Sequence, residues 1–505
     1  MTDDYAAVAR RTAASCRCTA RRGRKKRPFG SRKDVGTARP ARPAGGGDDG
    51  ALSAARRPMT TTLFLVAVVI LTALFFDFTN GFHDSANAMA TSVATGALRP
   101  RTAVLIAAVL NVVGAFLTTE VAKTISGGMV NDAFVTPTMI FAGLVAAILW
   151  NLTTWLFGLP SSSSHALFGG LIGAVLVGAG LSGVNFSVVV SKILLPAVIA
   201  PLVAGLGAAL AIFLVHRFFP ASDDEPAAGW FRRAQTVSGS MIALAHGTSD
   251  GQKTMGVITL VLITGGYQES GTGPQTWVIA CAGLAIGLGT YSGGWRIMRT
   301  MGKGLVELKS PQGFAAETTS AAAILASSHM GFGLSTTQVC SGSVIGSGVG
   351  RNLSMVRWGT ARRMVYGWLL TLPAAALFGA VGCAIALTGP VGVVIVLLAL
   401  CAGTVTIVAI SRRTAVNRHN VNDSRDVTVK FGRVATETML ATVATVAATT
   451  AAEAAAVIEP TTTDTSTTAA GPATGAISPI IIARPTAPPV ANEPTNSPTP
   501  PSPAR

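Results

Sequence analysis

Ten apolar segments recur along the chain, each long enough to form a helix across a membrane. A transmembrane helix needs about 20 mostly apolar residues. Only 12% of the residues are charged and the mean hydropathy is +0.50, whereas soluble proteins carry about 25% charged residues. We therefore expect an all-α polytopic membrane protein with about 10–12 membrane segments. The apolar segments lie at about residues 61–79, 102–119, 136–157, 166–183, 186–216, 238–264, 276–293, 314–332, 362–387 and 391–410.

Polar sequence of biased composition flanks this apolar region. Residues 1–58 hold 15 Lys and Arg against 5 Asp and Glu, a net charge of +10, which is typical of a disordered basic leader. Such a run can bind anionic lipid or nucleic acid, but we favour a translation start at Met59 and expect no nucleic-acid partner. Residues 413–505 are rich in Ala, Thr and Pro and are predicted to form a disordered or cytoplasmic tail.

Basic residues between the apolar segments predict the orientation of the chain. Three clusters of Lys and Arg alternate in the second half with loops that contain none. The positive-inside rule places these clusters in the cytoplasm. Residues 314–350 then leave and return to the same side, as a re-entrant hairpin does. The clusters cover residues 296–309, 351–363 and 412–413.

Two motifs occur twice, which indicates an internal repeat. Residues 80–89 read NGFHDSANAM and residues 246–255 read HGTSDGQKTM. Residues 158–173 read GLPSSSSHALFGGLIG, and residues 335–346 read STTQVCSGSVIG. All four stretches contain Gly and polar residues at membrane depth, where irregular backbone is tolerated only inside the protein or along a cavity. We therefore expect broken helices and re-entrant hairpins there.

The charge pattern gives the two copies opposite orientations. Residues 59–216 are predicted to form the first transporter repeat and residues 234–412 the second, joined by a cytoplasmic loop at residues 217–233. Inverted repeats with broken helices are an architecture of secondary transporters.

Hydroxyl side chains are concentrated at the predicted start of one helix in each repeat. A helix N-terminus exposes N–H groups and the positive end of its dipole, so added hydroxyls suit a tetrahedral oxyanion. Ordinary helix capping would explain one hydroxyl in each copy, but not the whole group. The candidate anion-binding residues are Ser162, Ser163, Ser164, Ser335, Thr336 and Thr337.

Ionisable residues inside the apolar segments are the candidates for coupling to a cation. Such residues are costly in a membrane and are functional hypotheses by default. A carboxylate that binds a proton or sodium could drive uptake of an anion, whereas the alternative is a structural Asp–Lys ion pair. The candidates are His83, Asp84, Asn87, Asp250, Lys253 and Glu317. The six cysteines have no metal or disulfide spacing, so no metal site and no cofactor are expected.

At these motifs the chain resembles the inorganic phosphate transporter (PiT) family, and it is most similar to the bacterial low-affinity branch. The resemblance covers about residues 60–412 and is carried by FDFTNGFHDSANAMATSVATGALRP, NLTTWLFGLPSSSSHALFGGLIGA, AHGTSDGQKTMGVITL and LSTTQVCSGSVIGSGVG. It implies import of inorganic phosphate with a coupling cation, in a multi-pass protein of the bacterial plasma membrane. It also implies that Ser162–Ser164 and Thr336–Thr337 contact phosphate and that Asp84, Asn87 and Asp250 lie at the cation region.

One departure from the family pattern affects the coupling ion. The position that matches Asn87 is Lys253 in the second copy. Its ammonium could occupy the place of a sodium ion, so we expect H⁺ symport rather than Na⁺ symport. Divalent metal could accompany the anion as a neutral metal–phosphate complex. A homo-oligomer is compatible with the pattern.

Two other functions compete with phosphate import. A sulfate permease would use the same donors, although a buried acceptor such as Asp84 favours phosphate, which still carries a proton. An intramembrane hydrolase could be built from Ser163, His165 and Asp84. The second copy has Gln338 in place of this histidine, and no P-loop is present. We therefore expect a transporter rather than an enzyme.

Overall fold

Helices are the only extended secondary structure in the described part of the chain. The structure is a computed structural model that describes residues 49–219 and 225–423, all in one compact unit. The elements labelled η are short 3₁₀ or π turns. The elements are α1 (Asp49–Ala94), α2 (Pro100–Gly114), α3 (Glu120–Thr124), η1 (Ile125–Met129), α4 (Pro137–Leu156), α5 (Ser163–Ala179), η2 (Leu181–Gly183), α6 (Phe186–Val188), η3 (Val189–Leu194), α7 (Leu195–Phe218), α8 (Glu225–Thr264), α9 (Thr276–Ser292), α10 (Trp295–Arg299), η4 (Thr300–Gly304), α11 (Ser310–His329), α12 (Thr336–Val349), η5 (Leu353–Met355), α13 (Trp358–Ala386) and α14 (Pro390–Arg413).

Five of the described helices are long and apolar enough to cross a membrane, judged by length and composition. A sixth span follows if α9 and the helix over Trp295–Gly304, which meet at 60°, count as one broken span. The protein is therefore an all-helical, multi-pass membrane protein with a broken helix pair. This count is below the predicted ten to twelve segments because helices such as α8 and α11 carry buried polar side chains, among them Glu317.

The apolar helices differ in how far they are enclosed by the rest of the protein. In α4, 78% of the apolar window is buried, against 17% for the span over Phe186–Phe218 and 22% for α14. Contiguous exposed apolar surface of this kind marks contact with a membrane or a partner. We therefore place α4 inside the helix assembly and the apolar faces of α7 and α14 against lipid.

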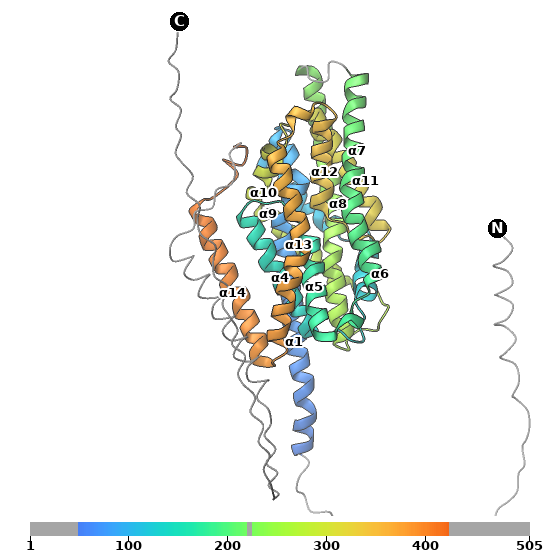
Figure 1. Cartoon of the computed structure of the whole chain (residues 1–505), viewed down its shortest axis with the longest axis vertical. Coiled ribbons are helices and arrows are strands. Elements are labelled where there is room, and N and C mark those ends of the chain that lie inside the picture. Colours follow the sequence, from blue (N-terminus) through green and yellow to red (C-terminus); the bar gives the residue numbers. More distant parts are fainter. Residues whose placement is uncertain (1–48, 220–224, 424–505) are drawn as a thin grey trace, which may run out of the picture. The chain divides into compact units, whose positions relative to one another are not determined.

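Helices of the two halves pack against each other in matched pairs. Helix α1 of the first half packs on α9 of the second half, and α8 of the second half packs on α2 of the first half. Likewise α5 packs on α13, beside α4 (Figure 1), and α12 packs on α7. Each pair joins one element of the first half to one of the second. The motifs that repeat in the sequence therefore occupy matching places in one interlocked assembly.

The acidic motifs at residues 80–89 and 246–255 lie on the continuous helices α1 and α8, so the prediction of a broken helix at each motif is wrong. The glycines that suggested a break instead allow two backbones to touch. A Cβ at Gly81 would lie 2.3 Å from the carbonyl oxygen of Ile286, and one at Gly247 would lie 2.3 Å from that of Asn111. Irregular backbone occurs instead in the turns before α5 and α12, where Gly158 and Gly331 have positive φ angles.

Candidate functional site

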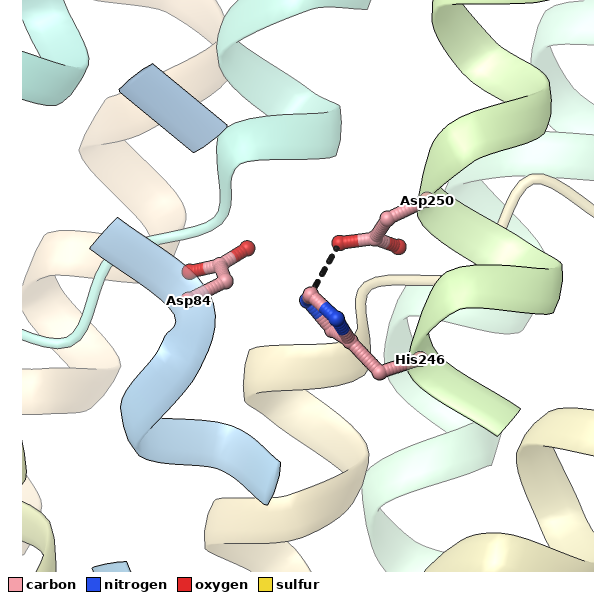
Figure 2. Close-up of side chains that lie close together, drawn as sticks. All are labelled: Asp84, His246 and Asp250. Atoms are coloured by element: carbon pink, nitrogen blue, oxygen red, sulfur yellow. Dashed lines mark ion pairs between the residues drawn. The ribbon is translucent and has the colours of Figure 1, made fainter. Parts of the chain in front are cut away.

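Asp84 lies on α1 and Asp250 on α8, and both side chains are buried. These two long helices pack directly on each other. In Figure 2 the two carboxylates approach each other from opposite sides, with His246 of α8 below them and next to Asp250. One ligand atom from each of the three residues lies within 4.8 Å of the others. The repeated motif therefore brings its two acids to one place.

Two helix N-termini face these acids. A turn after α4 leads into α5, where the Ser162 side chain caps the helix by accepting from the backbone N–H of His165 at 3.1 Å. A second turn after α11 leads into α12, where Ser335 accepts from the N–H of Gln338 at 3.3 Å. Capping thus uses one hydroxyl in each copy and leaves the following hydroxyls to other partners.

Asp84 accepts hydrogen bonds from both halves of the protein. The Ser163 hydroxyl donates to its Oδ2 at 2.5 Å, and the Thr337 hydroxyl donates to its Oδ1 at 3.2 Å. His83 Nδ1 lies 2.6 Å from the same Oδ1. The Asn87 amide nitrogen donates to Thr337 Oγ1 at 2.9 Å. Because Ser163 starts α5 and Thr337 starts α12, this carboxylate links the two helix starts.

Asp250 has a more basic environment than Asp84. Its Oδ1 accepts from the Lys253 ammonium one turn away, and its Oδ2 lies 3.2 Å from His246 Nε2. The Thr336 hydroxyl donates to Oδ2 at 3.1 Å. A fully buried ammonium beside one of two carboxylates leaves this region one negative charge in excess when the histidines are neutral. Such a charge is costly in a medium of low dielectric constant.

Three of the six predicted anion-binding residues do not touch these carboxylates in the structure. Ser162 and Ser335 act as caps, and Ser164 donates to the backbone oxygen of Leu334 at 3.1 Å. A fourth predicted residue, Glu317, lies in a separate cluster. Its carboxylate accepts from Thr91, Ser92, Ser238 and Gln235 at 2.5, 2.7, 2.6 and 3.1 Å.

A small cavity lies between the residues around Asp84 and Asp250, which form the central site, and the separate cluster around Glu317. Asn87 of the central site and Glu317 both line it, together with Thr91, Ser320 and Cys340. Glu317 is thus buried next to the central site without belonging to it.

His246 is a site residue that the sequence analysis did not select. Its Nδ1 lies 3.1 Å from Asn111 Oδ1, and the Asn111 amide nitrogen donates to Thr290 Oγ1 at 2.7 Å. The Thr290 hydroxyl in turn lies 2.9 Å from the carbonyl oxygen of Ile286. This chain orients the Asn111 carbonyl toward the imidazole, an arrangement that favours a proton on Nδ1. A signal for His246 was its spacing, four residues before Asp250 on one helix face.

The hydroxyls and carboxylates of this site have the chemistry of a membrane carrier for an oxyanion. A family model described as "Phosphate transporter family" matches residues 80–379. The chain belongs to this family. It is a transporter rather than an enzyme. His165, which a hydrolase would use together with Ser163 and Asp84, lies instead with its Nδ1 3.5 Å from Gln338 Nε2.

Individual relatives agree with the family assignment. A probable low-affinity inorganic phosphate transporter of Mycobacterium leprae (strain TN) is 52% identical over 362 residues, which cover 70% of this chain and 87% of the relative. A protein of the same description from Bacillus subtilis (strain 168) is 41% identical over 62% of this chain and 94% of its own length. Among solved structures, a sodium-dependent phosphate transporter matches with a TM-score of 0.57 and 25% identity, over 63% of this chain and 97% of that one.

Proposed function

We propose that this protein imports inorganic phosphate by secondary active transport coupled to protons. One observation carries the proposal: hydroxyls at the starts of α5 and α12 converge on two buried carboxylates. Ser163 and Thr337 donate to Asp84, and Thr336 donates to Asp250. The relatives described as inorganic phosphate transporters support phosphate as the substrate.

The same hydroxyls would bind the anion. A tetrahedral oxyanion needs several donors to replace its hydration shell, and two helix N-termini with added hydroxyls supply them. Here Ser163, Thr336 and Thr337 donate to carboxylates instead. Phosphate and the two carboxylates therefore compete for the same donors. When a proton binds to one of these carboxylates, the neutral carboxyl group accepts weaker hydrogen bonds from the hydroxyls. The hydroxyls are then available to phosphate, which links proton binding to phosphate binding.

Lys253 favours protons over sodium as the coupling ion. The matching residue of the first repeat is Asn87, whose amide is a neutral group that can ligate a cation. Lys253 is 0% exposed and its ammonium donates to Asp250. A fixed positive charge at that carboxylate disfavours a second cation there.

The matched helix pairs support two repeats of inverted topology. The bacterial relatives support the plasma membrane as the location. In this inverted arrangement α8 enters the membrane in addition to the apolar spans other than α4, whereas α4–α5 and α11–α12 form re-entrant hairpins. Glu317 would bind a coupling proton at one end of the cavity that begins at Asn87.

A divalent metal ion is a second candidate for part of the cargo. Asp84, His246 and Asp250 offer two carboxylates and an imidazole within 4.8 Å, a donor set that suits several divalent ions. The ion would travel with phosphate as a neutral complex. Uptake of labelled phosphate that stops when divalent ions are chelated would support this version.

Uptake assays in proteoliposomes test the proposal. Labelled phosphate should accumulate at fixed pH without sodium, and a tenfold excess of sulfate should leave the rate nearly unchanged. Strict dependence on sodium would overturn proton coupling. Strong competition by sulfate would overturn phosphate selectivity and favour a general oxyanion permease.

A further inference from the structure

A third buried acid, Asp77, lies on α1 two turns before Asp84. Its side chain is 0% exposed, and neither carboxyl oxygen has a hydrogen-bond partner among the described residues. Asn80 follows one turn later on the same face. It is 1% exposed, and both its amide atoms also lack a partner within the described part of the chain. Most buried polar groups are hydrogen-bonded, so two adjacent exceptions call for an explanation.

The helix α8 faces this pair. The Thr254 hydroxyl lies beside the Asp77 carboxyl, but neither group meets hydrogen-bond geometry. Asp250 and Lys253 are the charged groups of α8 that act on Asp77 through space. The other two helices that pack most extensively on α1, α4 and α9, contain no charged residue. Asp77, Asn80 and Thr254 therefore form a polar group, the Asp77 cluster, beside the central site.

The charges nearby leave no partner for an ionised Asp77. The Lys253 ammonium already bonds to Asp250, and His83 already lies on Asp84. An ionised Asp77 would place three carboxylates against one ammonium before any anion enters. An isolated buried carboxylate costs far more than a hydrogen-bonded one. A bound proton removes the charge and gives the carboxyl a donor for the neighbouring Thr254 hydroxyl.

We propose that Asp77 also binds a coupling proton, at a place distinct from Glu317 and from the hydroxyls that would hold phosphate. This inference rests on the proposed proton-coupled function. A proton from water on the side of uptake adds to a carboxylate oxygen of Asp77. After the protein opens to the other side, this O–H bond breaks and the proton passes to water there, which leaves the carboxylate ready for the next cycle.

The second repeat lacks an equivalent acid. The alignment of the acidic motifs places Ala243 where the first repeat has Asp77, and Ala243 is also fully buried. Conversely, His246 occupies the place of Asn80. The first repeat therefore carries the additional proton site, whereas the second carries the basic residues that neutralise Asp250.

The variant Asp77→Asn tests this inference in proteoliposomes that contain the full chain. Its neutral amide resembles a permanently protonated carboxyl. Exchange of labelled phosphate at equal concentration on both sides needs no net proton movement, whereas accumulation driven by an inward proton gradient does. We expect the ratio of accumulation to exchange to fall at least tenfold and the pH dependence of uptake to flatten. Asp77→Glu should restore accumulation with a displaced pH midpoint.

Controls separate this inference from the proposed function. Glu120→Gln alters an exposed acid and should keep both activities. Proton-driven accumulation by Asp77→Asn at the rate of the unaltered protein would overturn the role of Asp77 alone. An unaltered protein that accumulates phosphate only with sodium would overturn proton coupling itself, and the role of Asp77 with it.

A second variant keeps the test decisive if Asp77→Asn does not reach the membrane. Thr254→Val retains the acid and removes the neighbouring hydroxyl. It must then displace the pH midpoint of uptake, because the protonated carboxyl loses a hydrogen-bond acceptor. An unchanged midpoint would overturn the inference.

Discussion

Asp84 is the residue at which the two halves of the protein meet most directly. Its carboxylate accepts from Ser163 of the first half and from Thr337 of the second. A hydrogen bond to a charged group contributes about 1.5–3 kcal/mol. A single side chain therefore couples the two helix starts, and its charge state affects both.

Removal of the Ser163 hydroxyl should weaken phosphate uptake. Ser163→Ala takes away a donor at the start of α5, and a loss of about 1.5–3 kcal/mol corresponds to a roughly 10- to 150-fold rise in the apparent KM. Ser163→Thr, which keeps the hydroxyl, should recover most of this affinity. The exposed Ser182→Ala serves as a control. An unchanged KM in Ser163→Ala would contradict a role in binding the anion.

Replacement of Lys253 should change the response to sodium. Lys253→Asn copies the first repeat, removes the ammonium from Asp250 and leaves a neutral amide in its place. We expect uptake by the variant to be stimulated by sodium, at a lower rate than in the unaltered protein. Rates measured over a series of sodium concentrations at fixed pH test this expectation. Uptake that is active but indifferent to sodium would show that Lys253 does not decide the choice of ion.

At the residue scale the sequence predicted the two acids and the adjacent hydroxyls but missed their buried neighbours. Asp84 and Ser163 stood out because ionisable residues and hydroxyl clusters are rare in apolar segments. His246, Asn111 and Thr290 act through contacts between helices far apart in the chain. Only the fold brings Asn111 and Thr290 to the site, so no local pattern reveals these two, whereas the spacing of His246 from Asp250 was a usable signal.

At the scale of elements, the glycines of the acidic motifs hold long helices in contact. Gly81 on α1 meets the backbone of α9, and Gly247 on α8 meets that of α2. The Gly and polar residues of these motifs predicted broken helices, because a glycine that ends a helix and one that permits close packing look alike in sequence. The predicted apolar segments agree with helices such as α4, α9 and α14, since apolar length alone determines them.

An added methyl group at Gly247 should destabilise the fold. In Gly247→Ala the new Cβ would lie 2.3 Å from the carbonyl oxygen of Asn111, so α8 and α2 must move apart. Overpacking of this kind costs about 1–3 kcal/mol. The midpoint of thermal unfolding in detergent should fall. Gly367→Ala on α13 meets no atom within 4 Å and should be neutral or slightly stabilising. Equal midpoints for both variants would contradict close packing at Gly247.

At the scale of the whole molecule, equivalent turns follow the two hairpin helices. The turn at Leu181–Gly183 follows α5, and the turn at Leu353–Met355 follows α12. Each lies next to an isolated bridge, Val130 to Val184 in one case and Val306 to Val356 in the other. If the repeats are inverted, these equivalent turns lie on opposite sides of the membrane.

Cysteine labelling tests the inverted orientation. Ser182→Cys and Ser354→Cys place thiols at exposed positions in the two turns, in a protein whose six native cysteines are replaced by serine. An impermeant maleimide applied to intact cells should label Ser182→Cys only, whereas lysed cells should allow both to react. Labelling of both variants in intact cells would contradict inverted repeats.

The most direct test of proton-coupled phosphate import measures phosphate accumulation driven by a proton gradient alone. Proteoliposomes with the full chain, in buffers free of sodium, receive labelled phosphate with and without an inward proton gradient. We predict accumulation above the external concentration only with the gradient, and its collapse when a protonophore is added. Equal phosphate levels with and without the gradient, or accumulation that requires sodium, would contradict proton-coupled import.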